Sequence, residues 1–182
     1  MERVEDRIKN TFFKLLKKKN LDEIDVSSLS NASRITRQAF YYHFKDINDL
    51  IFSIYIDKEI KNTSLTSYND VILDLLNFLF DDEKFNKEVA SSNSSYILSD
   101  ITYYFLFRSF SLYLNALKSL NNDTKDYRKI LARFLANATN EEVLSLFIEK
   151  NSTKDSIFKE ITSLIDENLI EHLIRNLFTN FK

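Results

Sequence analysis

The chain has 182 residues, a net charge of −2 and 44% hydrophobic residues, enough to bury the core of one or two small domains. It contains no glycine, no proline and no cysteine. The lack of glycine excludes the phosphate-binding loops of nucleotide-binding proteins, and the lack of cysteine excludes disulfides and thiolate zinc sites. Because the favoured residues of hairpins and β-turns are also missing, the composition predicts an all-α fold.

Histidine is scarce as well. His43 and His172 are far apart in sequence and lack neighbouring residues at metal-ligand spacing. We therefore expect no metal site, no cofactor and no serine triad, and we expect that the chain is not an enzyme. The N-terminus lacks an apolar signal segment, and Arg108 interrupts the apolar region at 101–117. These patterns predict a cytoplasmic protein that does not enter the membrane.

An opening helix is predicted over residues 3–19. Its cluster at 17–19 consists of three lysines. These lysines either face DNA or complement the dipole at the end of a solvated helix. The apolar face of this helix consists of Val4, Ile8, Phe12, Leu15 and Leu16.

Two short helices are predicted next. Asp25 is suited to cap the first, over residues 26–33, because its carboxylate can accept hydrogen bonds from the free amides of a helix start. Residues 33–35 form a tight corner, and Thr36 caps a second helix that begins at Arg37. Two short helices joined by a brief turn are typical of the helix-turn-helix motif.

The second helix of such a motif lies in the major groove of DNA, with its first residues facing the base edges. Arg37 and Gln38 occupy these positions. Arginine can bind the O6 and N7 of guanine, and glutamine the N6 and N7 of adenine. Phe40 and Phe44, four residues apart, are predicted to be buried. Hydroxyl and imidazole groups that could reach phosphates belong to Tyr41, Tyr42 and His43.

The stretch from Ile35 to Leu50, which contains RQAFYYHFKD, resembles the signature of TetR-family regulators. The resemblance covers residues 4–56, and within the family this phrase is similar to regulators of the dihydroxyacetone kinase type. It implies a three-helix DNA-binding domain, a palindromic operator of double-stranded DNA, and a homodimer formed through C-terminal helices. The positions that the resemblance assigns to DNA binding are Thr36, Arg37, Gln38, Tyr41, Tyr42, His43 and Lys45.

Three positions depart from the family pattern. Arg34 replaces the usual glycine of the turn, Ala39 a frequent threonine, and Ile47 a lysine that often contacts phosphate. A residue with a Cβ in the left-handed conformation costs about 1 kcal/mol. Arg34 either adds a phosphate contact that compensates for Ile47 or simply faces solvent.

We predict a DNA-binding domain over residues 1–46 and a helical effector-binding and dimerisation domain over residues 47–182. A fourth helix, at 47–60, links the two, and polar residues at 61–67 follow it. Cap-like residues at 139–142 and 153–155 predict breaks between the later helices. Those helices are expected at 69–80, 82–90, 96–120, 124–137, 141–150 and 154–180.

The helix at 96–120 carries the candidate effector contacts, because pockets between helices combine an apolar lining with a few polar groups. The alternative is that its aromatic residues form core and that Arg108 faces solvent or contacts Asp100. The candidates are Tyr103, Tyr104, Phe107 and Arg108.

The final helix has more apolar circumference than one intramolecular neighbour would cover, so we expect it to pack against another subunit. A two-fold dimer would also place two recognition helices about one helical turn apart on palindromic DNA. The apolar positions are Phe158, Ile161, Leu164, Ile165, Leu169, Leu173, Leu177 and Phe181.

These features predict a TetR-like homodimeric transcription regulator. The resemblance implies a repressor that a small-molecule effector of unknown identity releases from DNA. The alternative is a regulator-like adaptor or co-activator with weak or no DNA binding, which binds a partner protein through an exposed aromatic surface. A sequence-specific complex with DNA distinguishes the two.

Overall fold

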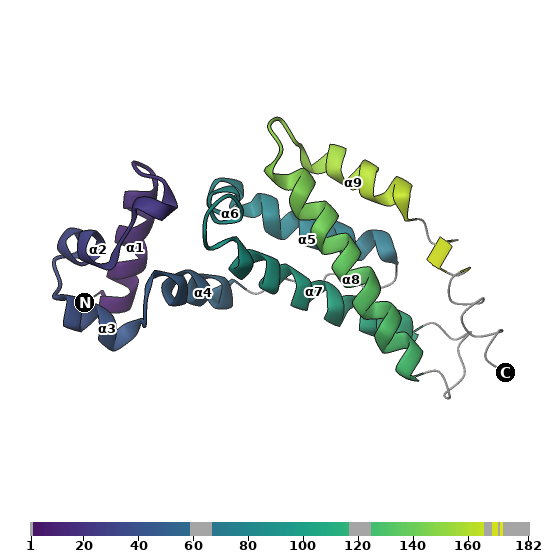
Figure 1. Ribbon diagram of the computed structural model, residues 1–182, viewed down its shortest axis with the longest axis horizontal. Coiled ribbons are helices and arrows are strands. Elements are labelled where there is room, and N and C mark those ends of the chain that lie inside the picture. The colour runs from purple at the N-terminus through teal and green to yellow at the C-terminus, as the bar shows by residue number, and fades with distance from the viewer. Residues whose placement is uncertain (1, 59–66, 117–124, 166–168, 171, 173–182) are drawn as a thin grey trace. The chain divides into compact units, whose positions relative to one another are not determined.

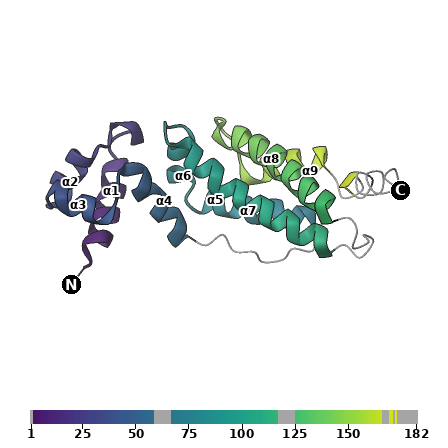
Figure 2. The ribbon, with the colours of Figure 1, turned by 60° about the horizontal axis from the view of Figure 1, so that its bottom comes forward.

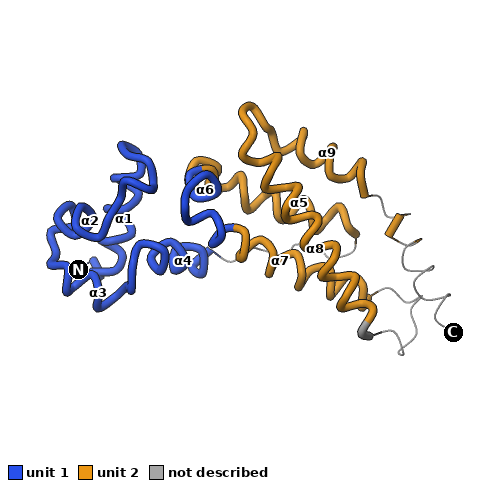
Figure 3. The backbone as a smooth tube through the Cα atoms, viewed as in Figure 1, with its two compact units in different colours: residues 1–59, 88–98 blue, residues 60–87, 99–182 orange. Residues whose placement is uncertain are grey.

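The computed structural model describes residues 2–58, 67–116, 125–165, 169–170 and 172. Over these residues the chain forms nine α-helices and one short 3-10 helix, without a strand (Figure 1). The all-α prediction is confirmed. No helix of the described ranges is both long enough and apolar enough to span a membrane. Figure 3 shows two compact units, formed by residues 1–59 with 88–98 and by residues 60–87 with 99–182.

The first unit is built around its opening helices. α1 packs against α2, and α2 packs against α3 (Figure 2). Ile8, Phe12, Leu29, Phe40 and Leu50 are fully buried, and burial of each such side chain contributes about 1.5–3 kcal/mol. The helices are α1 (Val4–Leu16), α2 (Val26–Ser33), α3 (Arg37–His43) and α4 (Ile47–Asp57).

Two helices end at earlier residues than predicted. α1 ends at Leu16 rather than at residue 19, and the turn that follows lets Leu21 and Ile24 return to the core. α4 ends at Asp57 rather than at residue 60, because Lys58 leaves the helical region with φ −98° and ψ 89°.

The second unit contains the later helices. In both ribbon views α9 lies beside α8, and it also contacts α5 (Figures 1 and 2). Residues 88–98, at the end of α6 and the start of α7, belong to the first unit instead. The helices are α5 (Tyr68–Asp81), α6 (Glu83–Ala90), α7 (Ser95–Ala116), α8 (Lys125–Ile148) and α9 (Lys154–Leu164).

The predicted break at 139–142 is wrong, because α8 runs through these residues. α8 is one continuous helix, because the two polar residues in its middle bond to other helices instead of capping. Asn140 accepts a hydrogen bond from the Thr102 hydroxyl over 2.6 Å and donates to the Ser99 carbonyl and hydroxyl over 3.2 and 3.1 Å. The Thr139 hydroxyl is paired with the Tyr68 hydroxyl at 3.4 Å. Polar residues predicted to stop a helix therefore join α8 to α5 and α7.

The last predicted helix, 154–180, is interrupted. α9 ends at Leu164, because Ile165 is extended with φ −129° and ψ 98°. Leu164 is 58% exposed, whereas Ile161 is buried. Leu173, Leu177 and Phe181, which we expected to pack against another subunit, lie outside the described residues.

Two hydrogen bonds attach the loop between α6 and α7 to the rest of the first unit. The Asn93 amide donates to Asp22 Oδ1 over 3.1 Å, and the Ser94 hydroxyl donates to Asn48 Oδ1 over 2.6 Å. Asp22 lies in the 3-10 helix Leu21–Glu23, and Asn48 lies in the first turn of α4. The first unit is thus completed by a stretch of chain well separated from it in sequence.

Candidate nucleic-acid interface

Reciprocal hydrogen bonds between Asp25 and Ser28 fix the start of α2. The Ser28 amide donates to Asp25 Oδ1 over 2.6 Å, and the Asp25 amide donates to Ser28 Oγ over 3.2 Å. The backbone bond from Ser28, followed by the bond to its side chain, lowers the pKa of the Asp25 carboxyl below its ordinary value. The Asp25 cap is therefore negatively charged at neutral pH, and its charge interacts favourably with the positive end of the α2 helix dipole.

Arg34 forms the turn between α2 and α3. It adopts the left-handed conformation, with φ 55° and ψ 47°, a region that favours glycine. The amides of Arg34 and Ile35 donate over 3.1 Å to the carbonyls of Asn31 and Ser30, which would otherwise be free at the end of α2. The turn thus places a residue with a Cβ in the left-handed region, and the Arg34 side chain is exposed.

α3 begins with a side-chain cap and two exposed polar residues. Thr36 Oγ1 accepts a hydrogen bond from the Ala39 amide over 3.1 Å. Arg37 and Gln38, in the first turn, both have exposed side chains. The sequence placed these residues correctly relative to the helix start, so the first turn of α3 presents a guanidinium and a carboxamide to the outside.

The remainder of α3 divides into a buried and an exposed face. Phe40 is fully buried and Phe44 nearly so, and their ring centroids lie 5.7 Å apart. Tyr42 is 85% exposed and Tyr41 is 50% exposed. His43 is half-buried, with its ring edge-on to Tyr42 at 5.1 Å. The buried phenylalanines hold the helix by one face and leave both tyrosine hydroxyls accessible.

A carboxylate pair shapes the turn from α3 into α4. Asp46 Oδ1 accepts a hydrogen bond from the Asp49 amide over 2.8 Å and so caps α4. Asp49 Oδ2 accepts from the Lys45 amide over 2.8 Å. The backbone of Lys45 is fixed in this way, and its side chain is exposed.

The exposed side chains around α3 include several hydrogen-bond donors. In the part of the chain that the structure describes, their side chains make no hydrogen bond and no ion pair. Their donor groups are therefore available to phosphate oxygens or base edges. The residues concerned are Arg34, Arg37, Gln38, Tyr41, Tyr42 and Lys45.

Lys9, which sequence reasoning missed, supports this surface from α1. Its Nζ lies 2.7 Å from carboxylate oxygens of Glu5 and Asp57 and 5.8 Å from the ring centroid of Phe44. Burial opposes the charged form, but the hydrogen bonds to Asp57 and Glu5 outweigh it and raise the pKa of Lys9. The spacing of Glu5 and Lys9 was visible in the sequence, whereas nothing local indicated Asp57.

The four candidate effector contacts lie on α7. Tyr103 and Phe107 are half-buried with nearly parallel rings 6.2 Å apart, while Tyr104 is 68% exposed and Arg108 is exposed. A cavity of about 250 Å³ in the second unit is lined by residues of α5, α8 and α9 and the residue that follows α9, and by none of these four. No group of three or more His, Asp or Glu side chains among the described residues could hold a metal ion.

Comparison with known proteins finds a likeness among solved structures. No family model matches the sequence, and no curated protein matches it. Among solved structures, a protein named dihydroxyacetone kinase operon activator DhaS aligns with a TM-score of 0.54 and 19% identity, over 88% of this chain and 93% of that one. The chain shares the fold of this regulator.

Proposed function

We propose that the chain is a TetR-like DNA-binding transcription regulator in which α2 and α3 form a helix-turn-helix. The observation that carries the proposal is the first turn of α3, where Arg37 and Gln38 are exposed and unpaired. Phe40 and Phe44 hold the opposite face of the same helix in the core. The likeness in fold to an operon regulator supports this assignment.

In this proposal α3 enters the major groove with its N-terminal end toward the bases. Arg37 then donates two hydrogen bonds to a guanine, and Gln38 pairs with an adenine. The phosphate contacts fix the register of α3 on the duplex without reading sequence. We assign them to Arg34, Thr36, Tyr41, Tyr42, His43 and Lys45.

We further propose a homodimer formed through the C-terminal helices. Ile130 and Phe134 on α8 are 60% and 63% exposed, and Leu164 at the end of α9 is also exposed, which leaves apolar surface for a second copy. A two-fold dimer would bind a palindromic operator whose half-sites lie about 34–36 Å apart. Two copies would also double the number of phosphate contacts.

Regulation by an effector completes the proposal. A small molecule that prefers the arrangement unable to bind DNA would release the operator, and only a difference in affinity between the two arrangements can do so. Tyr103, Tyr104, Phe107 and Arg108 remain the proposed contacts on α7. We propose repression as the default, while the structural neighbour is named an activator, so the sign must be read from a reporter fused to the operator.

The test is binding of the full-length protein to labelled DNA from upstream of its gene and to random DNA across a salt series. We expect tight, salt-sensitive binding that favours the upstream fragment. Arg37→Ala and Gln38→Ala should each weaken the specific complex by about tenfold or more and reduce the preference. Fluorescence anisotropy measures both affinities.

Lys159→Ala provides the matched control, because Lys159 is an exposed cation on α9. It should leave the preference for upstream DNA unchanged. Binding that is absent even at low salt would contradict the proposal and favour the adaptor or co-activator. That alternative predicts a complex with a partner protein through exposed aromatic residues such as Tyr127 and Phe134.

A further inference from the structure

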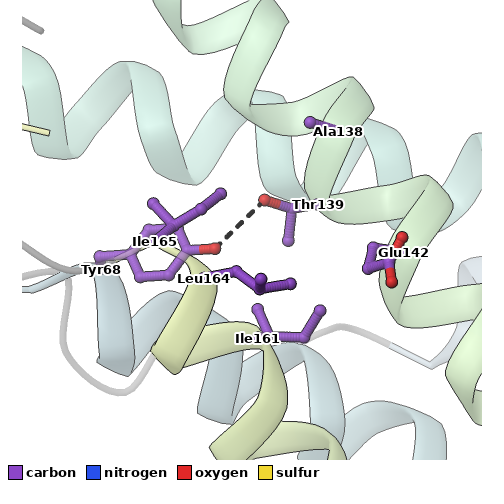
Figure 4. Close-up of a pocket in the computed structure, with 7 residues that line it drawn as sticks. All are labelled: Tyr68, Ala138, Thr139, Glu142, Ile161, Leu164 and Ile165. Carbon is purple, nitrogen blue, oxygen red and sulfur yellow. Dashed lines mark hydrogen bonds between the residues drawn. The ribbon is translucent and has the colours of Figure 1, made fainter. Parts of the chain in front are cut away.

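The cavity of about 250 Å³ in the second unit lies between three helices (Figure 4). It is smaller than the pockets that hold drug-sized ligands, which span about 300–1,000 Å³. In Figure 4 Tyr68 and Glu142 lie on opposite sides of the lining. The described residues that line it are Tyr68 from α5, Ala138, Thr139 and Glu142 from α8, Ile161 and Leu164 from α9, and Ile165.

A pair of buried hydroxyls forms one end of the cavity. Tyr68 is fully buried and Thr139 is 1% exposed, and their oxygens are 3.4 Å apart, a long distance for a hydrogen bond between hydroxyls. Only one of the two protons can serve this bond. The other has no acceptor among the described residues. A buried donor in this state is unfavourable, so a ligand oxygen that accepts it would be stabilised.

The surroundings of Tyr68 keep this donor in place. Its ring stacks on Phe110 with centroids 5.5 Å apart and an interplanar angle of 8°. Burial raises the pKa of the Tyr68 phenol, while the bond to Thr139 opposes this only in part. The phenol is therefore protonated throughout the neutral range and can donate.

The other end of the cavity carries a single charge. Glu142 follows Thr139 by three residues, which places both on one face of α8. Its side chain is exposed, so the carboxylate lies at the rim. Among the described residues the lining contains no basic side chain, and the wall between its two polar ends consists of Ala138, Ile161, Leu164 and Ile165.

We propose that this cavity binds a small amphiphilic amine that carries an oxygen at the end of its apolar body remote from the nitrogen. The ammonium group pairs with Glu142, and the oxygen accepts from the hydroxyl pair of Tyr68 and Thr139. Ile161 and Leu164 cover the apolar body. Anions of the same shape are rejected, because Glu142 repels them and no cation among the described lining residues compensates.

The experiment compares two probes that differ only in the charged group. Tyramine carries a phenol and an ammonium, and 3-(4-hydroxyphenyl)propionate carries the same phenol on a chain that ends in a carboxylate. Isothermal titration calorimetry on the full-length protein without DNA should show tyramine binding at least about tenfold tighter than the carboxylate. Because no DNA is present, the result does not depend on the proposed regulatory function.

Variants assign the selectivity to individual groups. Glu142→Gln should weaken tyramine binding by about tenfold and abolish the preference for the ammonium. Tyr68→Phe removes only the hydroxyl and should weaken both probes. Glu141→Gln is the matched control, because Glu141 is the exposed carboxylate that precedes Glu142 and does not line the cavity. This variant should bind both probes as the parent protein does.

Three outcomes overturn the proposal: no binding of tyramine, equal affinity for the two probes, or equal losses in the Glu141 and Glu142 variants. A separate measurement with operator DNA addresses regulation. If tyramine binds through Glu142 and yet leaves DNA affinity unchanged, the amine site is supported, and release of DNA from this site is refuted.

Discussion

Two described residues have a positive φ, and neither is glycine: Arg34 at 55° and Asn151 at 72°. Asparagine enters this region comparatively easily because its short side chain can bond to nearby backbone. Arginine has no such advantage. Strained backbone of this kind is concentrated at functional positions, and the exposed guanidinium of Arg34 adjoins the start of α3. Conformation and charge at this residue can be separated by substitution.

Arg34→Gly should raise the free energy of unfolding by about 1 kcal/mol, because it removes the Cβ from the left-handed region. Arg34→Ala keeps the Cβ and should leave stability nearly unchanged. Both variants lose the charge, so both should lose the same salt-dependent part of DNA affinity if Arg34 contacts a phosphate. Urea unfolding and DNA titration measure the two effects. Equal stability of the glycine and alanine variants would show that the turn is not strained.

Tyr68 makes stability depend on pH in the alkaline range. Burial raises its pKa in the folded protein above the ordinary value of 10.0, so the unfolded chain loses this proton first. The contribution is fully present below pH 10 and declines as pH rises above 10 toward the folded pKa. The free energy of unfolding of Tyr68→Phe should therefore fall less steeply between pH 9.5 and 11 than that of the parent. The two slopes against pH should differ by up to about the equivalent of one bound proton. Tyr42→Phe, at an exposed tyrosine, should follow the parent in urea unfolding.

At the scale of elements, the side-chain amide of Asn140 joins the middle of α8 to α7. Asn140 is 6% exposed and bonds to Thr102 and Ser99 on α7. Asn140→Ala would remove the hydrogen bonds of this amide to the Thr102 hydroxyl and to the Ser99 carbonyl and hydroxyl, and should lower the free energy of unfolding by about 1–3 kcal/mol. Asn137→Ala, one turn earlier, loses only a bond to the Arg133 carbonyl of its own helix and should change stability by about 0.5 kcal/mol or less. Equal effects in thermal unfolding would exclude a structural role for the contact between α7 and α8.

The same helices show which elements sequence can predict. α2 and α3 begin at the predicted residues because their caps, Asp25 and Thr36, lie within three residues of the amides they accept from. Thr139 and Asn140 have the same chemistry, yet α8 continues through them. Their partners, Tyr68 and Thr102, lie 71 and 38 residues away, and no local pattern reveals such a contact.

The candidate sites divide in the same way. The exposed donors of α3 follow from local periodicity, so the sequence predicted Arg37, Gln38 and the tyrosines as surface residues. The ion pair between Lys9 and Asp57 could not be predicted from local periodicity, because the two residues are 48 positions apart in sequence. The cavity lined by Tyr68, Thr139 and Ile161 combines three helices, each of which contributes residues that look like ordinary core.

At the scale of the whole molecule, the first compact unit is made from two stretches of chain, 1–59 and 88–98. The second stretch is bound through Asn93 to Asp22 and through Ser94 to Asn48. Chains emerge from the ribosome at about 5–20 residues per second, so the second stretch follows the first by roughly 2–8 seconds. During synthesis, α1 to α4 must therefore persist for seconds before the segment that completes their unit exists, which is ample time for a helical unit to fold provisionally and for chaperones to bind it.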